Sequence, residues 1–184
     1  QGIASGALSR TAFAYYVGQD AFFLDAFARA YSLAAAKAPD LESFTALHQL
    51  AGGVLSELML HQSYASSWEI DIHTVQPGPA TRQYVDFLLS TAWSQPVGVT
   101  IVAMAPCMRL YAFLGQELSQ QDTSSSPYHD WVQTYGGQAF EELARQLETL
   151  VDQLAQDSGL IRSSYRYAMV CVDSFFTAAY QYQP

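Results

Sequence analysis

Positive charge is scarce in this sequence, which has a single lysine, Lys37, and seven arginines scattered over its 184 residues. Seventeen acidic residues bring the formal net charge to −9 at pH 7. Nucleic acids and anionic membranes are bound by clustered cations, which this sequence does not have. We therefore expect no nucleic acid and no membrane as a partner.

Cysteine is also rare, with only Cys107 and Cys171 in the chain. The two residues form no disulfide framework and no spacing typical of a metal site. We expect both to be buried or active-site thiols in a reducing compartment. The sequence has no signal-peptide pattern, and its longest apolar run, VGVTIVAMA, is about half the length that spans a bilayer. These absences predict a cytoplasmic protein. The chain starts QGIASGALSR, without an initiator methionine, so we expect an N-terminal helix to be missing from it.

The pattern of hydrophobic residues is helical along nearly the whole chain. Half of the residues are hydrophobic and 14% are charged, which favours one compact domain over residues 1–184. Apolar residues recur at spacings of three and four, and only EIDIH (69–73) alternates as a strand would. The expected fold class is therefore all-α, a helical bundle. The predicted helices are 9–37, 40–68, 81–93, 97–118, 137–156 and 160–180, with a short one ending at Trp131.

The stretch APCMRLYAFLGQE (105–117) contains a thiol and a phenol one helical turn apart. Residues four apart lie on the same face of a helix, so Cys107 and Tyr111 should point in the same direction. Burial explains the pair, because cysteine behaves as a small hydrophobic residue and tyrosine packs at the edge of a core. The functional alternative is a nucleophile beside a hydroxyl that orients a substrate.

The stretch YYVGQDAFFL (15–24) surrounds a carboxylate with aromatic residues. Asp20 shares a helix face with Tyr16 and Phe23. Such a group is suited to a flat, nitrogen-rich heterocycle, because the rings stack on its face and the carboxylate accepts hydrogen bonds from its N–H groups. The alternative is an aspartate on a solvated helix surface, although the neighbours Ala21, Phe22 and Phe23 are unusual for such a position.

The stretch ELMLH (57–61) places Glu57 and His61 one turn apart. Carboxylate-bridged di-iron bundles need two Glu-x-x-His pairs, and this sequence has none. A structural glutamate–histidine pair is the better interpretation, and we expect no metal.

Two common catalytic signatures are absent, and one glycine pair is ambiguous. The sequence has neither the G-x-S-x-G turn of serine hydrolases nor a phosphate-binding glycine motif. In TYGG (134–137), Tyr135 precedes two glycines, so it can project into a cavity where the backbone turns. A helix cap explains these glycines equally well.

Four stretches taken together resemble the TenA family: YYVGQDAFFLDAFARA, APCMRLYAFLGQEL, HDWVQTYGG and SSYRYAMVCVDSFFTAAY. The likeness covers essentially the whole chain. Its Y-x-x-Q-D and P-C-x-x-x-Y motifs are specific when they occur together in this order. The resemblance implies the haem-oxygenase-like helical fold and the activity of thiaminase II, also called aminopyrimidine aminohydrolase.

The resemblance also implies a reaction and a set of roles. The family removes the amino group of 4-amino-5-aminomethyl-2-methylpyrimidine by hydrolysis and releases ammonia and the hydroxymethyl pyrimidine that is reused for thiamin; some members also cleave thiamin. By this resemblance Cys107 is the nucleophile, Asp20 binds the ring nitrogen and amino group, and Phe23 stacks on the ring. The residues expected to line the pocket are Tyr84, Tyr111 and Tyr135. The resemblance implies a homotetramer that needs no cofactor.

The sequence departs from the family at one position of its last helix. Members usually have a glutamate four residues before the second member of an aromatic pair, where it protonates a ring nitrogen. The pair here is Phe175–Phe176, and the position is Val172, which cannot transfer a proton. Either the neighbouring Asp173 supplies the acid, or the protein lacks it and has another substrate or only binds a pyrimidine. A metal-dependent oxygenase of the same fold is a third alternative, which requires several histidines and carboxylates to converge.

Overall fold

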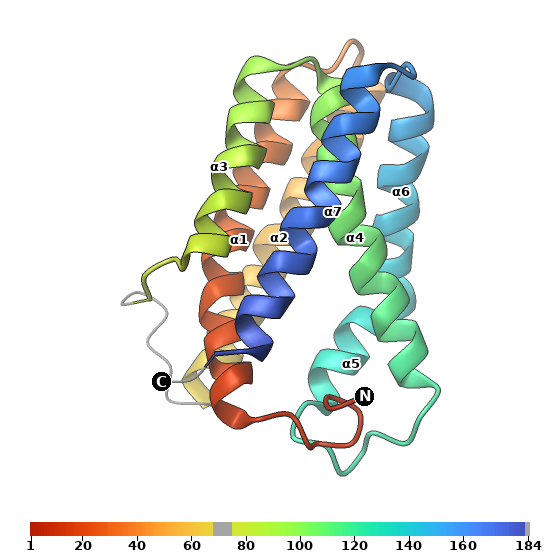
Figure 1. The fold of residues 1–184 in the computed structure, drawn as a ribbon. Coiled ribbons are helices and arrows are strands. Elements are labelled where there is room, and N and C mark those ends of the chain that lie inside the picture. The colour runs from red at the N-terminus through yellow and green to blue at the C-terminus, as the bar shows by residue number, and fades with distance from the viewer. Residues whose placement is uncertain (68–74, 183–184) are drawn as a thin grey trace.

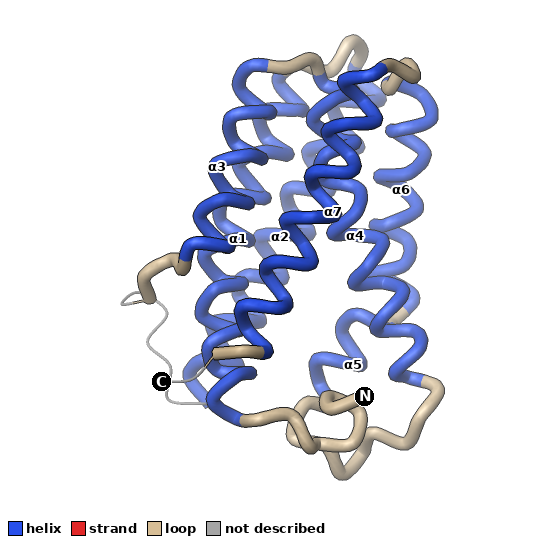
Figure 2. The backbone as a smooth tube through the Cα atoms, in the orientation of Figure 1, coloured by secondary structure: helices blue, strands red, loops and turns tan. Residues whose placement is uncertain are grey.

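The computed structural model describes residues 1–67 and 75–182, which form an elongated bundle of helices (Figure 1). Within these residues there are seven helices and no strand (Figure 2). The helices are α1 (Arg10–Ala36), α2 (Leu41–Ser67), α3 (Pro79–Ser94), α4 (Val97–Ser119), α5 (His129–Gly136), α6 (Gln138–Leu154) and α7 (Gly159–Tyr180). The predicted all-α fold class is confirmed, whereas EIDIH (69–73) lies outside the described residues.

Most helix boundaries lie within a few residues of the predicted ones. Asp40 caps α2 as expected, because its Oδ1 accepts a 2.7 Å hydrogen bond from the backbone N–H of Ser43. The exception is α5, which was expected to be interrupted at TYGG (134–137). It continues through Tyr135, and the helical backbone ends only at Gly137, whose φ and ψ are −72° and 152°.

A close approach of two helices explains why α5 continues. A Cβ atom at Gly115 on α4 would overlap the backbone of Tyr135 and Gly136 on α5. The missing side chain therefore allows the two backbones to touch, and this contact fixes the position of Tyr135.

Helices α1 and α4 form the centre of the bundle. Helix α1 packs mainly against α2 and α3, and α4 packs against α5, α6 and α7. Among the described helices, only α4 is long and apolar enough to cross a membrane, with a mean hydropathy of 1.7 over its best stretch. Two-thirds of that stretch (67%) is buried by the surrounding helices, as expected for the central helix of a bundle.

Candidate active site

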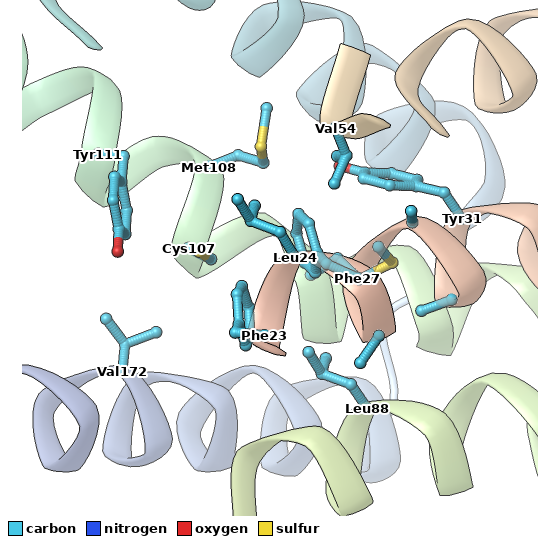
Figure 3. Close-up of a cluster of buried hydrophobic side chains, with 14 of the residues drawn as sticks. Phe23, Leu24, Phe27, Tyr31, Val54, Leu88, Cys107, Met108, Tyr111 and Val172 are labelled. Atoms are coloured by element: carbon cyan, nitrogen blue, oxygen red, sulfur yellow. The ribbon is translucent and has the colours of Figure 1, made fainter. Parts of the chain in front are cut away.

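Two adjoining hollows in the interior meet at Phe23, Cys107 and Tyr111, and we refer to them together as the Cys107 hollow. Figure 3 shows these three side chains and Val172 around the same space. The polar residues in the remaining wall are Asp20, Glu57 and Tyr84. Only about 10 Å³ in each part is open to the centre of a water molecule, which is room for one water. A ligand as large as a pyrimidine therefore enters only if lining side chains move.

Helix α4 directs both Cys107 and Tyr111 into this hollow. The two side chains are buried, with Cys107 6% exposed, and both line the hollow, so the predicted shared face is confirmed. Pro106 lies inside the helix and donates no backbone hydrogen bond to the preceding turn, directly before the thiol.

Asp20 is held at the centre of a buried hydrogen-bond network. It is only 2% exposed, so the alternative of a solvated surface aspartate is wrong. The hydroxyl of Tyr16 donates to Oδ2 at 3.1 Å, and that of Tyr111 donates to Oδ1 at 3.2 Å. Trp131 Nε1 in turn donates to the Tyr16 hydroxyl at 3.0 Å. Helices α1, α4 and α5 thus fix the carboxyl group together.

A second set of contacts joins Asp20 to Glu57 on α2. The Tyr135 hydroxyl donates a 2.5 Å hydrogen bond to Glu57 Oε1. His61 Nε2 lies 3.1 Å from the Tyr135 hydroxyl and 3.3 Å from Asp20 Oδ2. Two carboxyl groups from different helices are therefore linked through one imidazole and one phenol.

Burial makes both carboxyl groups weak acids. Loss of solvation raises the pKa of Asp20 from 3.8 to about 7, although hydrogen bonds from Tyr16 and Tyr111 oppose the increase. Loss of solvation, together with the nearby charge of Asp20, raises the pKa of Glu57 from 4.5 to about 7, against the hydrogen bond from Tyr135. Burial therefore favours the protonated form of both groups more than water does.

The thiol and the imidazole are uncharged in the same surroundings. Burial, with the negative charges of Asp20 and Glu57, raises the pKa of Cys107 well above 9, and the Tyr84 hydroxyl offsets part of this increase. Burial lowers the pKa of His61, which favours a neutral ring. Since a thiolate is the reactive form of cysteine, Cys107 must lose its proton during the reaction itself.

Aromatic rings form most of the remaining wall. The ring of Phe23 lies 4.8 Å from that of Tyr84 and 5.9 Å from that of Phe175, measured between centroids. The Tyr84 hydroxyl is buried near the Cys107 thiol, but in the part of the chain that the structure describes it forms no hydrogen bond of normal geometry. A buried hydroxyl without a partner is costly, and here it borders the Cys107 hollow, where a ligand can supply the partner.

Asp173 is the predicted site residue that the structure does not bring to this hollow. Val172 is 3% exposed and lines the hollow beside Cys107, as the family pattern predicts for its position. Asp173 is exposed and lines a separate surface hollow together with Arg109 and Tyr165. One residue along a helix is a rotation of about 100°, and α7 has no local shift that cancels it.

Tyr135 does not line the hollow directly but contacts Glu57, which does.

Glu57 and His61 belong to the site, although sequence reasoning assigned them only a structural role. Their spacing in ELMLH was the available signal, but their proximity to Asp20 depends on how α1 and α2 pack. Asp20, Glu57 and His61 each offer a possible metal ligand atom, and these atoms lie within 4.8 Å of one another. The three residues could hold a zinc or iron ion. Without an ion, Tyr135 donates a hydrogen bond to Glu57 Oε1 and Tyr111 donates one to Asp20 Oδ1.

The bundle has the haem-oxygenase-like helical fold, as solved structures show. It is similar to a TenA family transcription regulator from Silicibacter, with a TM-score of 0.91 and 23% identity over 98% of this chain and 87% of that one. It is also similar to a TenA homologue from P. horikoshii, with a TM-score of 0.87 and 23% identity over the same shares of both chains.

The family assignment comes from the sequence. Residues 1–181 match the TENA/THI-4/PQQC family, and the chain belongs to it. It is 32% identical over 162 residues to the aminopyrimidine aminohydrolase of Bacillus subtilis, which covers 86% of this chain and 69% of that protein. It is 36% identical over 209 residues to the bifunctional TH2 protein, mitochondrial, of Arabidopsis thaliana, which covers 99% of this chain. The chain spans about a third (34%) of the TH2 protein and about a fifth (19%) of the thiamine biosynthesis multifunctional protein ThiED of Corynebacterium efficiens.

Proposed function

We propose that the protein hydrolyses an aminomethyl pyrimidine, releasing ammonia and the hydroxymethyl pyrimidine used in thiamin salvage, with Cys107 as the nucleophile. The observation that carries this proposal is that Cys107 and Asp20 border one hollow together with Phe23. The similarity to the aminopyrimidine aminohydrolase of Bacillus subtilis supports the same class of substrate.

In the proposed complex, each wall of the hollow recognises a different part of the substrate. Phe23 stacks on the face of the ring. Asp20 binds the ring nitrogen and amino group, and its pKa of about 7 allows it to accept or donate a hydrogen bond near neutral pH. The Tyr84 hydroxyl, which has no partner in the described chain, binds a polar atom of the substrate.

Cys107 acts by covalent catalysis. Its sulfur adds to the ring carbon next to the one that carries the aminomethyl group, while the thiol proton passes to a ring nitrogen. Addition removes the aromaticity of the ring, so its electrons can expel the amino group from the exocyclic methylene. Water then adds to the methylene carbon and the carbon–sulfur bond breaks, which restores the ring and the thiol.

Substrate entry requires a change in the packing around the hollow. Met108 is the most adaptable side chain in its wall, because the unbranched thioether has several low-energy rotamers. Its movement would enlarge the space beside Cys107 without displacing the helix backbone.

The proposed enzyme works in the cytoplasm as a homotetramer and needs no cofactor. Large hydrophobic side chains at its surface support association, since they include Leu41 at 78% exposure and Trp93 at 71% exposure. Light scattering coupled to gel filtration tests this, and a monomer at micromolar concentration would rule out the tetramer.

Product analysis tests the proposed reaction. The protein, dialysed against a chelator, is incubated with 4-amino-5-aminomethyl-2-methylpyrimidine, and ammonia and hydroxymethyl pyrimidine are measured. Equimolar release of both products supports the proposal. Saturable binding without ammonia would instead indicate a pyrimidine-binding protein, and activity only after iron or manganese is restored would indicate a metal enzyme.

A further inference from the structure

We infer that Glu57 on α2 gives a proton to the leaving amine and takes one from the attacking water in this site, where α7 offers only Val172. The inference rests on the proposed hydrolysis and assigns one of its steps. Glu57 lies on α2, whereas members of the family usually have their glutamate on the last helix.

Position is the first observation that supports this role. Glu57 and Cys107 line the same part of the hollow, so a substrate bonded to the sulfur can reach the glutamate there. Val172 borders the other part, and Asp173 borders neither. The wall contains two carboxyl groups. Asp20 is proposed to bind the substrate, which leaves Glu57 for proton transfer.

The hydrogen bonding of Glu57 differs from that of Asp20. Both oxygens of Asp20 accept bonds from tyrosines, which fixes this carboxyl group for recognition. Among the described residues, only Tyr135 bonds to Glu57, and it does so at Oε1. One carboxyl oxygen therefore stays available to exchange a proton with a substrate or with water.

The groups around Glu57 favour an exchangeable proton. Those that face it or interact with its charge are Tyr16, Asp20 and Tyr31 from α1, His61 from its own helix, Cys107 and Tyr111 from α4, and Tyr135 from α5. None of them is a lysine or an arginine, so within the part of the chain that the structure describes no lysine or arginine holds the carboxylate in its charged form. The carboxyl group can therefore hold a proton as well as release one.

Glu57 gives up one proton and takes up one proton in the proposed step. Protonated Glu57 shares its proton with the amine of the bound substrate, and when the carbon–nitrogen bond breaks this proton leaves as part of ammonia. The resulting carboxylate removes a proton from the water that adds to the methylene carbon. The hydroxyl group remains on the product, and the proton taken from this water leaves Glu57 protonated again. The sum is one water consumed and one ammonia released.

Steady-state kinetics of Glu57→Gln against pH tests the assignment. We expect kcat to fall about 10²- to 10³-fold, with a much smaller change in KM, and the pH dependence of kcat to change because only Asp20 of the two carboxyl groups remains. Glu42→Gln, an exposed position in the first turn of the same helix, should behave as wild type. Wild-type kinetics in Glu57→Gln together with a loss of activity in Asp173→Asn would overturn the assignment.

A second variant decides the matter if Glu57→Gln does not fold. Tyr135→Phe removes the hydrogen bond that lowers the pKa of Glu57, so the ionisation seen in kcat should move to higher pH. An unchanged pH profile would contradict a proton-transfer role. If the proposed function itself is wrong, the wild-type protein will release no ammonia. This result differs from a wrong assignment of Glu57, in which the wild-type protein is active.

Discussion

Oδ2 of Asp20 lies 3.3 Å from Nε2 of His61, and both side chains are buried. At the surface such a pair would be an ion pair. In this interior, burial raises the pKa of Asp20 and lowers the pKa of His61, so both groups favour their neutral forms. The stability of the fold is therefore coupled to pH at the same residues that are proposed to bind substrate.

We expect Asp20→Asn to gain stability relative to wild type as pH rises. Folding raises the pKa of Asp20, so its contribution to stability is fully present below about pH 4 and is lost as pH rises through about 7. The variant has no such loss. Its free energy of unfolding should rise relative to wild type by on the order of 3 kcal/mol between about pH 4 and pH 9.

Urea unfolding followed by circular dichroism at several pH values measures this difference. His61 acts in the opposite direction, because its lowered pKa favours stability as pH rises through its unfolded-state value. Since both proteins retain His61, subtracting their curves leaves the contribution of Asp20 together with its effect on the pKa of Glu57. Parallel curves for the two proteins would mean that Asp20 is not a weak acid in the folded state.

Tyr84→Phe should affect stability and binding in opposite senses. The Tyr84 hydroxyl is buried without a partner among the described residues, so its removal should leave the free energy of unfolding unchanged or raise it by up to about 1 kcal/mol. Affinity for an aminopyrimidine, measured by calorimetry, should fall about tenfold, because one hydrogen bond to the ligand is lost.

Tyr31→Phe is the matched control for that change. The Tyr31 hydroxyl is also buried without a partner in the described chain, but Tyr31 does not line the Cys107 hollow. It should show the same small effect on stability and no effect on affinity. Equal losses of affinity in both variants would argue against a specific contact to Tyr84.

Gly115→Ala tests the close contact that positions Tyr135. The added methyl group would overlap the backbone of α5, so we expect a loss of about 1–3 kcal/mol in stability and reduced activity. Gly52→Ala is the control, because Gly52 is an exposed position in α2 with no atom near an added Cβ. This change should stabilise the protein by about 0.5–1 kcal/mol. A neutral Gly115→Ala would show that the two helices separate at little cost.

Sequence periodicity predicted the fold well because each helix buries one face against its neighbours. The cap at Asp40 and the start of α3 near two prolines could be predicted from the sequence, because both depend on a few adjacent residues. The continuation of α5 through Tyr135 could not be predicted, because it depends on Gly115 in another helix.

The site was predictable only in part, for the same reason. Asp20, Phe23 and Tyr16 could be grouped because they share one helix face. Glu57 gave a local signal through His61, but its link to Tyr135 exists only after α2 and α5 pack together. The choice between Val172 and Asp173 depends on the rotation of α7 about its axis, which the structure settles in favour of Val172 facing the hollow.

The two cysteines provide the most direct test of the central claim. Cys107 lines the hollow, whereas Cys171 is also buried but lies outside it, so alanine substitutions remove the same sulfur atom from inside and from outside the site. The measurement is the initial rate of ammonia release from 4-amino-5-aminomethyl-2-methylpyrimidine. We predict that Cys171→Ala keeps the wild-type rate and that Cys107→Ala loses about 10³-fold or more. A Cys107→Ala protein that releases ammonia at the wild-type rate would contradict the nucleophilic role of this residue.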